Sequence, residues 1–108
     1  MRPMLYGDLH VAARRLAGLD PHRQRQAIGD MLTRAHAADL WRKRKGTDHP
    51  DWGNGSLTMA ASKGWPEPAG PVTELAYLGA LTVVAKGIVT WRLARSPAPQ
   101  RGAVTVGT

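Results

Sequence analysis

Most prolines and glycines in the first 95 residues of this 108-residue chain fall in three clusters, which divide that part of the chain into four stretches. The clusters span residues 18–21, 46–55 and 64–71. Glycine and proline disfavour the continuation of a helix, so each cluster predicts a break in secondary structure. Between the clusters, apolar residues recur at the three- and four-residue spacing that is typical of helices. The sequence therefore predicts an all-α fold: a small bundle of three long helices plus one short helix.

The first two long helices are predicted from their start and stop signals. The first should cover residues 8–17, with the carboxylate of Asp8 as its N-cap. The pair Asp20-Pro21 is the clearest start signal in the chain, because aspartate caps a helix and proline suits its first position. The second helix should therefore cover residues 21–44, and Gly46 should end it. Its predicted apolar stripe is Ile28, Met31, Leu32, Ala35, Ala38 and either Asp39 or Trp41.

A loop with a tryptophan in it follows, over residues 47–55. Burial of an indole ring is worth roughly 2–3 kcal/mol, so we expect Trp52 to be at least half buried at one end of the core. Ser56 should cap the short helix, over residues 57–62. The connector that begins at Trp65 contains three prolines and must be extended, and we expect this tryptophan to anchor it.

The last long helix is predicted over residues 72–95 and is apolar on more than one face. Its expected core-facing set is Leu75, Leu78, Leu81, Val84 or Ala85, Ile88, Val89 and Trp91. A helix that is hydrophobic nearly all round is either central to a core or partly covered by another subunit. The small residues Gly79, Ala80 and Gly87 would let a second helix come close. The predicted protein-interaction residues are Tyr77, Leu78, Val83 and Trp91.

Bulk composition bounds the class of protein. We expect one helical domain over residues 1–95 and a disordered tail over residues 96–108, whose only large apolar groups are two valines. The absence of cysteine fits a reducing cytoplasm, where we expect the protein to be located. The start of the chain has no secretory pattern. The longest uncharged stretch, residues 75–85, is too short to span a bilayer, so no membrane partner is expected.

The charge balance is strongly positive, with 15 lysines and arginines against 8 acidic residues and a net charge of +7. Such a surplus favours a polyanionic partner, either nucleic acid or an acidic protein. The alternative is that an arginine-rich surface reflects the base composition of a GC-rich bacterial genome.

The densest basic run follows Trp41, whose ring could stack on a base. The predicted nucleic-acid-binding residues are Arg34, Arg42, Lys43, Arg44 and Lys45. No helix-turn-helix is recognisable, so we expect contacts to phosphates without base-specific readout. The same cations would also stabilise the negative end of a helix dipole, which is the structural alternative.

No motif indicates an enzyme, and we expect no catalytic residue, cofactor or metal site. His36 and Asp39 are spaced so that they could share a metal, but a site needs at least three converging donors. The segment His49–Gly55 could present an imidazole, a carboxylate and an amide to a ligand. Residues of these types also stabilise turns, and we favour that structural role.

Several short segments together resemble an uncharacterised family of short bacterial helical proteins of alphaproteobacterial type. They are Met1-Arg2-Pro3, Gly7-Asp8, Ala38-Asp39 with the basic run, and His49–Leu57. The last, which reads His-Pro-x-Trp-Gly-Asn-Gly-Ser-Leu, is the most specific. Such proteins are similar to companions of gene transfer agent regulators, which implies a regulatory or DNA-linked role and no catalytic residues.

Two functions are consistent with these features. The first is a small basic accessory regulator that acts on nucleic acid or on a nucleic-acid-bound protein. The alternative is a helical assembly or adaptor protein, for example a phage-type packaging or scaffold component. That protein would act through self-association, as a homo-oligomer, or through docking of its last helix onto a partner.

Overall fold

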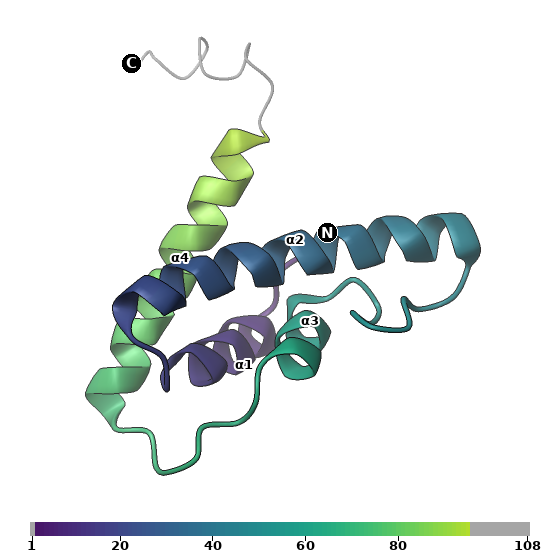
Figure 1. Cartoon of the computed structure of the whole chain (residues 1–108). Coiled ribbons are helices and arrows are strands. Elements are labelled where there is room, and N and C mark those ends of the chain that lie inside the picture. Colours follow the sequence, from purple (N-terminus) through teal and green to yellow (C-terminus); the bar gives the residue numbers. More distant parts are fainter. Residues whose placement is uncertain (1, 96–108) are drawn as a thin grey trace, which may run out of the picture.

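The computed structural model describes residues 2–95, which form four α-helices and no β-strand (Figure 1). The predicted all-α fold is confirmed. The helices are α1 (Tyr6–Leu16), α2 (Pro21–Lys45), α3 (Leu57–Gly64) and α4 (Glu74–Ala94). The predicted disordered tail, residues 96–108, lies outside the described residues.

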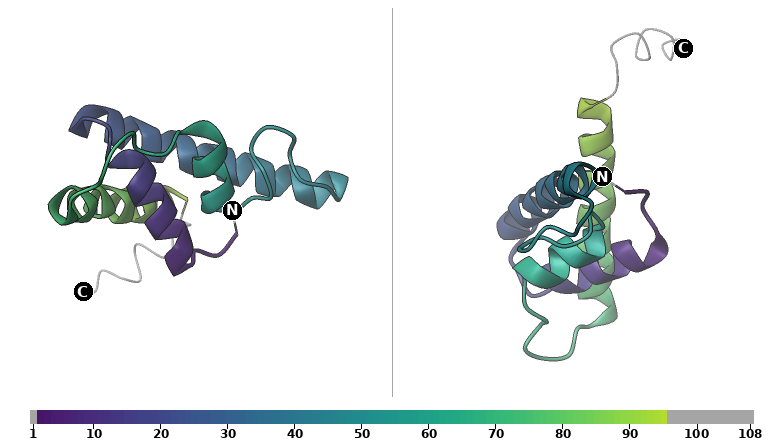
Figure 2. Two further views of the ribbon diagram at one scale, coloured as in Figure 1. Left: turned by 90° about the horizontal axis from the view of Figure 1, so that it is seen from below. Right: turned by 90° about the vertical axis from the view of Figure 1, so that its right-hand side faces the viewer.

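The four helices surround one small core. Helices α1 and α3 pack side by side on one side of α2, and α4 crosses both α1 and α2 (Figures 1 and 2). Alanines fill much of the interior, which lets the helices approach closely. Every helix contributes at least one large, fully buried side chain to this core: Leu16, Met31, Leu32, Leu57 and Val84.

Three of the predicted helix signals act as expected. The carboxylate of Asp20 accepts a hydrogen bond from the backbone N–H of Arg23 at 3.0 Å and so caps α2. Gly46 ends α2 in the left-handed conformation, with φ at +76°. The hydroxyl of Ser56 accepts from the N–H of Met59 at 3.2 Å and caps α3. These signals lie within four residues of the backbone groups they satisfy, which is why sequence alone reveals them.

The predicted starts of α1 and α4 were wrong by two residues each. Helix α1 begins at Tyr6, so Asp8 is not its N-cap but the third residue of its first turn. From there its carboxylate reaches back to accept from the N–H of Leu5 at 2.9 Å, as the acidic residue of a capping box does. Helix α4 begins after Thr73, whose hydroxyl accepts from the N–H of Ala76 at 3.1 Å.

The core-facing set predicted for α4 was also partly wrong. Within this helix only Ala80 and Val84 are fully buried, whereas Leu75, Leu78 and Val89 are exposed. The reason is that α1 and α2 cover α4 from one side only. A sequence pattern shows that a helix has apolar faces, but neighbouring elements decide which of them is buried.

Close packing explains one of the two glycines of α4. A Cβ atom on Gly87 would lie 2.9 Å from both branches of Ile28, so α2 approaches α4 at this point. A Cβ on Gly79 would meet nothing within 4 Å, so the predicted close approach does not occur there.

The tryptophans of the loop and of the connector lie where the sequence predicted them. Trp52 is more than half buried, and Trp65 packs against the core and anchors the proline-rich connector, as predicted. On α2 the apolar stripe continues to Asp39, which is fully buried, while Trp41 is only partly buried.

Candidate functional site

Two of the predicted nucleic-acid-binding residues at the end of α2, Arg42 and Lys43, share a carboxylate of the protein itself. A terminal nitrogen of Arg42 lies 3.1 Å from Oδ1 of Asp39, and Nζ of Lys43 lies 3.2 Å from Oδ2. Asp39 is only 1% exposed, and this burial alone would raise its pKa. Hydrogen bonds from Lys43 and Arg42 outweigh the burial and hold the pKa of Asp39 at about 2. Asp39 is therefore ionised at neutral pH and offsets part of the positive charge of this cluster.

The other predicted cations differ in their surroundings. The guanidinium of Arg34 lies 4.9 Å from the ring centre of Trp65 and 5.9 Å from that of Trp52. These distances are typical of cation–π contacts, which fix Arg34 in place two turns before the basic run. Lys45 has its ammonium 5.6 Å from the ring of Trp41, and Arg44 is exposed. The structure thus brings Arg42, Lys43, Arg44 and Lys45 together and holds Arg34 apart among the tryptophans.

The loop after α2 is organised by ring stacking. The imidazole of His49 stacks on Trp52 at 4.6 Å and meets the edge of Trp41 at 4.9 Å. Its Nδ1 atom accepts hydrogen bonds from the N–H groups of Asp51 and Trp52. The side-chain oxygen of Asn54 likewise accepts from the N–H of Ser56 within the same loop. These internal bonds support the structural interpretation of His49–Gly55 over the ligand-loop interpretation.

Two glycines of this loop lie against neighbouring elements. Gly55 has φ at +94°, and a Cβ there would lie 2.8 Å from Cα and Cβ of Asp39. Gly53 has φ at +91°, and a Cβ there would lie 2.5 Å from Cβ of Met59. Only glycine satisfies both the conformation and the close contact. The Trp-Gly-Asn-Gly-Ser-Leu segment therefore joins α2 to α3.

A second buried carboxylate, which the sequence analysis treated only as a cap, joins α1 to α3. Oδ1 of Asp8 accepts from the backbone N–H of Thr58 at 3.0 Å and from its hydroxyl at 2.6 Å. The partner lies fifty residues away in the sequence. No local signal could have indicated this contact.

The side of α4 that faces away from α1 and α2 is apolar and uncovered in residues 2–95. Its large side chains are exposed by 81% at Leu75, 48% at Leu78, 56% at Val89 and 63% at Leu93. With Ala85 they lie along one side of the helix, called here the α4 face, where the exposed Thr82 separates Leu75 and Leu78 from Ala85, Val89 and Leu93. Of the predicted interaction residues, Leu78 belongs to this face.

The other predicted interaction residues, Tyr77, Val83 and Trp91, are partly buried against the core. Leu75 and Val89, which also belong to the α4 face, were predicted to lie in the core. The signal available in the sequence was the helical spacing: Leu75 lies three residues before Leu78, and Val89 lies eleven residues, about three turns, after it.

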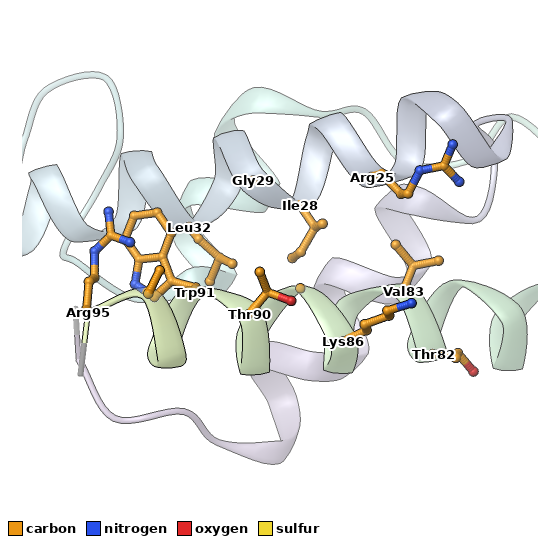
Figure 3. A pocket seen from close by; sticks show the side chains of 12 residues that line it. Arg25, Ile28, Gly29, Leu32, Thr82, Val83, Lys86, Thr90, Trp91 and Arg95 are labelled. Carbon is orange, nitrogen blue, oxygen red and sulfur yellow. The ribbon is translucent and has the colours of Figure 1, made fainter. Parts of the chain in front are cut away.

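A groove of about 600 Å³ lies between α2 and α4 (Figure 3). Apolar side chains form much of its lining, and three exposed cations stand around it, Arg25, Lys86 and Arg95. No carboxylate lines it among the described residues. The sequence could not reveal this α2–α4 groove, because its two walls are about fifty residues apart in the chain.

Helix α4 is also long and apolar enough, by length and composition, to cross a membrane. Lys86 lies near the middle of the helix, and one side of the helix packs on α1 and α2. The uncharged stretch 75–85, which was predicted to be too short to span a bilayer, is one part of this longer helix.

Metal binding gains no support from the described part of the chain. In residues 2–95 no three histidine or acidic side chains gather where they could hold a metal ion.

These features define a small all-α protein with an uncovered apolar helix face, a cation-rimmed groove and a basic helix end. The chain belongs to the family DUF7742, described as a domain of unknown function, whose model matches residues 2–88. No curated protein matches the chain, and no solved structure matches it. The family match agrees with the predicted membership of an uncharacterised family.

Proposed function

We propose that this protein is a helical assembly protein that works by self-association through the α4 face. The observation that carries the proposal is the exposure of Leu75, Leu78, Val89 and Leu93 along one side of a helix with only two fully buried residues. Single exposed apolar residues are common on soluble proteins, but several on one side of one helix are typical of an interaction site. The stripe from Leu75 to Leu93 is about 27 Å long at 1.5 Å per residue.

The α4 face is complementary to itself when two helices run antiparallel. A two-fold axis at the level of Val84 would bring Leu78 of one copy close to Val89 of the other, and Leu75 close to Leu93. Ala85 near the axis is small and would let the helices approach. A two-fold axis uses the same patch on both copies, which is the commonest symmetry of soluble oligomers.

The charges at the ends of α4 support the same arrangement. Glu74 stands in the first turn and Arg92 in the last turn of the helix. Antiparallel packing would bring Glu74 of one copy to the end of the helix that carries Arg92 of the other. Parallel packing would instead bring like charges together.

Sedimentation equilibrium of the full chain tests this proposal. We expect a dimer for the native protein and a monomer for Leu78→Lys, because a buried lysine without a partner is strongly unfavourable. Leu40→Lys is the matched control, since Leu40 is 46% exposed and lies on α2, away from the α4 face. It should leave the mass unchanged. A native protein that stays monomeric at millimolar concentration contradicts the proposal. Flotation with anionic vesicles that Leu78→Lys abolishes would assign the face to a membrane instead.

A phage-type packaging or scaffold component is one form that such an assembly protein could take. The proposal includes a location in the cytoplasm, which agrees with a cysteine-free chain.

The second candidate is an accessory regulator that contacts nucleic acid through phosphates. It is favoured by Arg44 and Lys45, which are exposed and, in the part of the chain that the structure describes, have no carboxylate within ion-pair distance. The net charge of +7 agrees with it. A companion of gene transfer agent regulators would be one example of such an accessory regulator.

Fluorescence anisotropy with a labelled DNA duplex tests this second candidate. We expect affinity to fall steeply with salt, by a slope of about 0.9 in log K per phosphate contacted. The double change of Arg44→Glu and Lys45→Glu should remove most of the binding. The control, Lys63→Glu, changes an exposed cation on α3 and should have little effect. Absence of native binding at low salt excludes the candidate.

A further inference from the structure

Gly29 of α2 lines the α2–α4 groove and leaves space there, because it has no side chain. A Cβ atom on Gly29 would meet nothing within 4 Å, although a glycine inside a helix costs about 1 kcal/mol relative to alanine. Ile28 and Leu32, on either side of it, are almost fully buried and form the apolar base. Val83 and Trp91 of α4 form the facing wall (Figure 3).

The charges around the groove are all positive and are spread along it. Arg25 stands on α2 and Lys86 on α4, while Arg95, the C-cap of α4, follows Lys86 by nine residues, or about 13 Å along a helix. The guanidinium of Arg95 lies 3.2 Å from the ring centre of Trp91 and so sits over the apolar wall. An occupant therefore needs an apolar face together with several negative charges at separate points.

We propose that the α2–α4 groove binds an acidic amphipathic helix of a partner protein. The apolar stripe of such a helix would lie over Ile28, Gly29 and Leu32, and its flanking carboxylates would meet the three cations. This site is separate from the α4 face and does not depend on self-association.

Charge separates this occupant from the other classes of ligand. A fatty acid has one carboxylate and would pair with one of three separated cations. A nucleic-acid strand has enough charge, but its bases would meet aliphatic side chains at the base of the groove, and the ring of Trp91 already has Arg95 over it. Residues 96–108 of the chain carry Arg101 and no acidic side chain, so they lack the several negative charges that the groove requires.

Titration of the full chain with synthetic peptides tests the proposal. The probe is a fluorescein-labelled 18-residue helical peptide with leucines at every third and fourth position and glutamates beside them. A peptide with lysines in place of those glutamates is its control. We expect the glutamate peptide to bind and the lysine peptide not to bind, as charge complementarity requires.

Two pairs of variants locate the site. Gly29→Leu fills the groove and should weaken binding at least about tenfold, whereas Gly29→Ala adds one methyl group and should change it by less than about twofold. Changing Arg25 and Lys86 together to glutamate should also weaken binding at least about tenfold, while Lys63→Glu should not. Since Arg25 and Lys86 are exposed, this second pair stays informative if Gly29→Leu fails to fold.

Three results would overturn the proposal. The first is no binding of the glutamate peptide by the folded native protein at about 1 mM, the weakest affinity that a specific site would show. The second is equal binding by the native protein and the double glutamate variant. The third is binding of dodecanoate, blocked by Gly29→Leu, without binding of the peptide. Leu78→Lys should bind the peptide as the native protein does, which separates this outcome from that of the self-association test.

Discussion

Two buried aspartates connect parts of the chain that no local pattern relates. Asp39 holds Arg42 and Lys43 on α2 and lies against Gly55 of the loop that returns to α3. Asp8 accepts hydrogen bonds from the backbone N–H and the hydroxyl of Thr58. A buried carboxylate is stable only when its oxygens are paired, so each aspartate fixes the position of the segment that supplies its partners.

The pKa of Asp39 predicts how stability depends on pH. Its pKa is about 2 in the folded protein, below the ordinary value of 3.8. Ionised Asp39 therefore stabilises the fold above pH 3.8, and this contribution, roughly 2 kcal/mol, is lost as the pH falls from about 4 to about 2. Asp39→Asn should lower the free energy of unfolding in urea at pH 7 by at least that amount, and the difference should shrink toward pH 2.

The control for this prediction is Asp30→Asn, since Asp30 is an exposed carboxylate on the same helix. It should change the free energy of unfolding by less than about 0.5 kcal/mol. A deficit for Asp39→Asn that stays constant from pH 7 to pH 2 would contradict the assignment to the charge of Asp39.

Glycine-to-alanine changes should have opposite signs at two positions. Gly55→Ala introduces a Cβ in a left-handed conformation and 2.8 Å from the backbone of Asp39, so it should destabilise the fold by roughly 2 kcal/mol or more. Gly79→Ala lies on an open helix surface and should stabilise it by up to about 1 kcal/mol. Thermal unfolding followed by circular dichroism measures both. A stabilising effect of Gly55→Ala would contradict the close seating of the loop on α2.

At the level of the helices, the sequence predicts those features that depend on neighbouring residues in the chain, such as helix ends. The ends of α2 and the start of α3 follow from Asp20, Gly46 and Ser56, because a cap acts within one turn. The buried side of α4 did not follow, since it depends on the placement of α1 and α2. The basic run at the end of α2 was visible, and its pairing with Asp39 was available from the three- and four-residue spacing. The α2–α4 groove could not be seen, because it exists only once two distant helices meet.

The two helix-start aspartates should differ in their importance. Asp20→Ala removes an exposed cap and should cost about 1 kcal/mol. Asp8→Ala removes a buried carboxylate and leaves the N–H groups of Leu5 and Thr58 without their acceptor, so it should cost roughly 3 kcal/mol. Urea denaturation at pH 7 measures both values. Equal costs would mean that the junction of α1 and α3 does not depend on Asp8.

In the whole molecule, the two proposed interaction surfaces lie on different sides of α4. One side carries the apolar α4 face, and the other borders the cation-rimmed groove. A chain with a small alanine-rich core gains stability when it associates, because association buries further apolar surface. The proposed self-association therefore has a thermodynamic signature that does not require a known partner.

Thermal stability should depend on protein concentration. For a dimer that dissociates on unfolding, a hundredfold rise in concentration stabilises each chain by about 1.4 kcal/mol, which corresponds to roughly 5–10 °C in Tm. The native protein should show this shift, and Leu78→Lys should not. A Tm that is independent of concentration in the native protein would indicate that the α4 face has no second copy on it.

The end of α4 after Trp91 runs beyond α2 and is exposed (Figure 1). In an isolated chain, the backbone amides of this end should exchange their hydrogens for deuterium fastest among those of the helix, because fraying there breaks few other contacts. A docked antiparallel copy would cover the same end with the first turns of its own α4. Slowed deuterium uptake at residues 89–94, matched by slowed uptake near residue 75, would then map the two-fold axis onto the sequence.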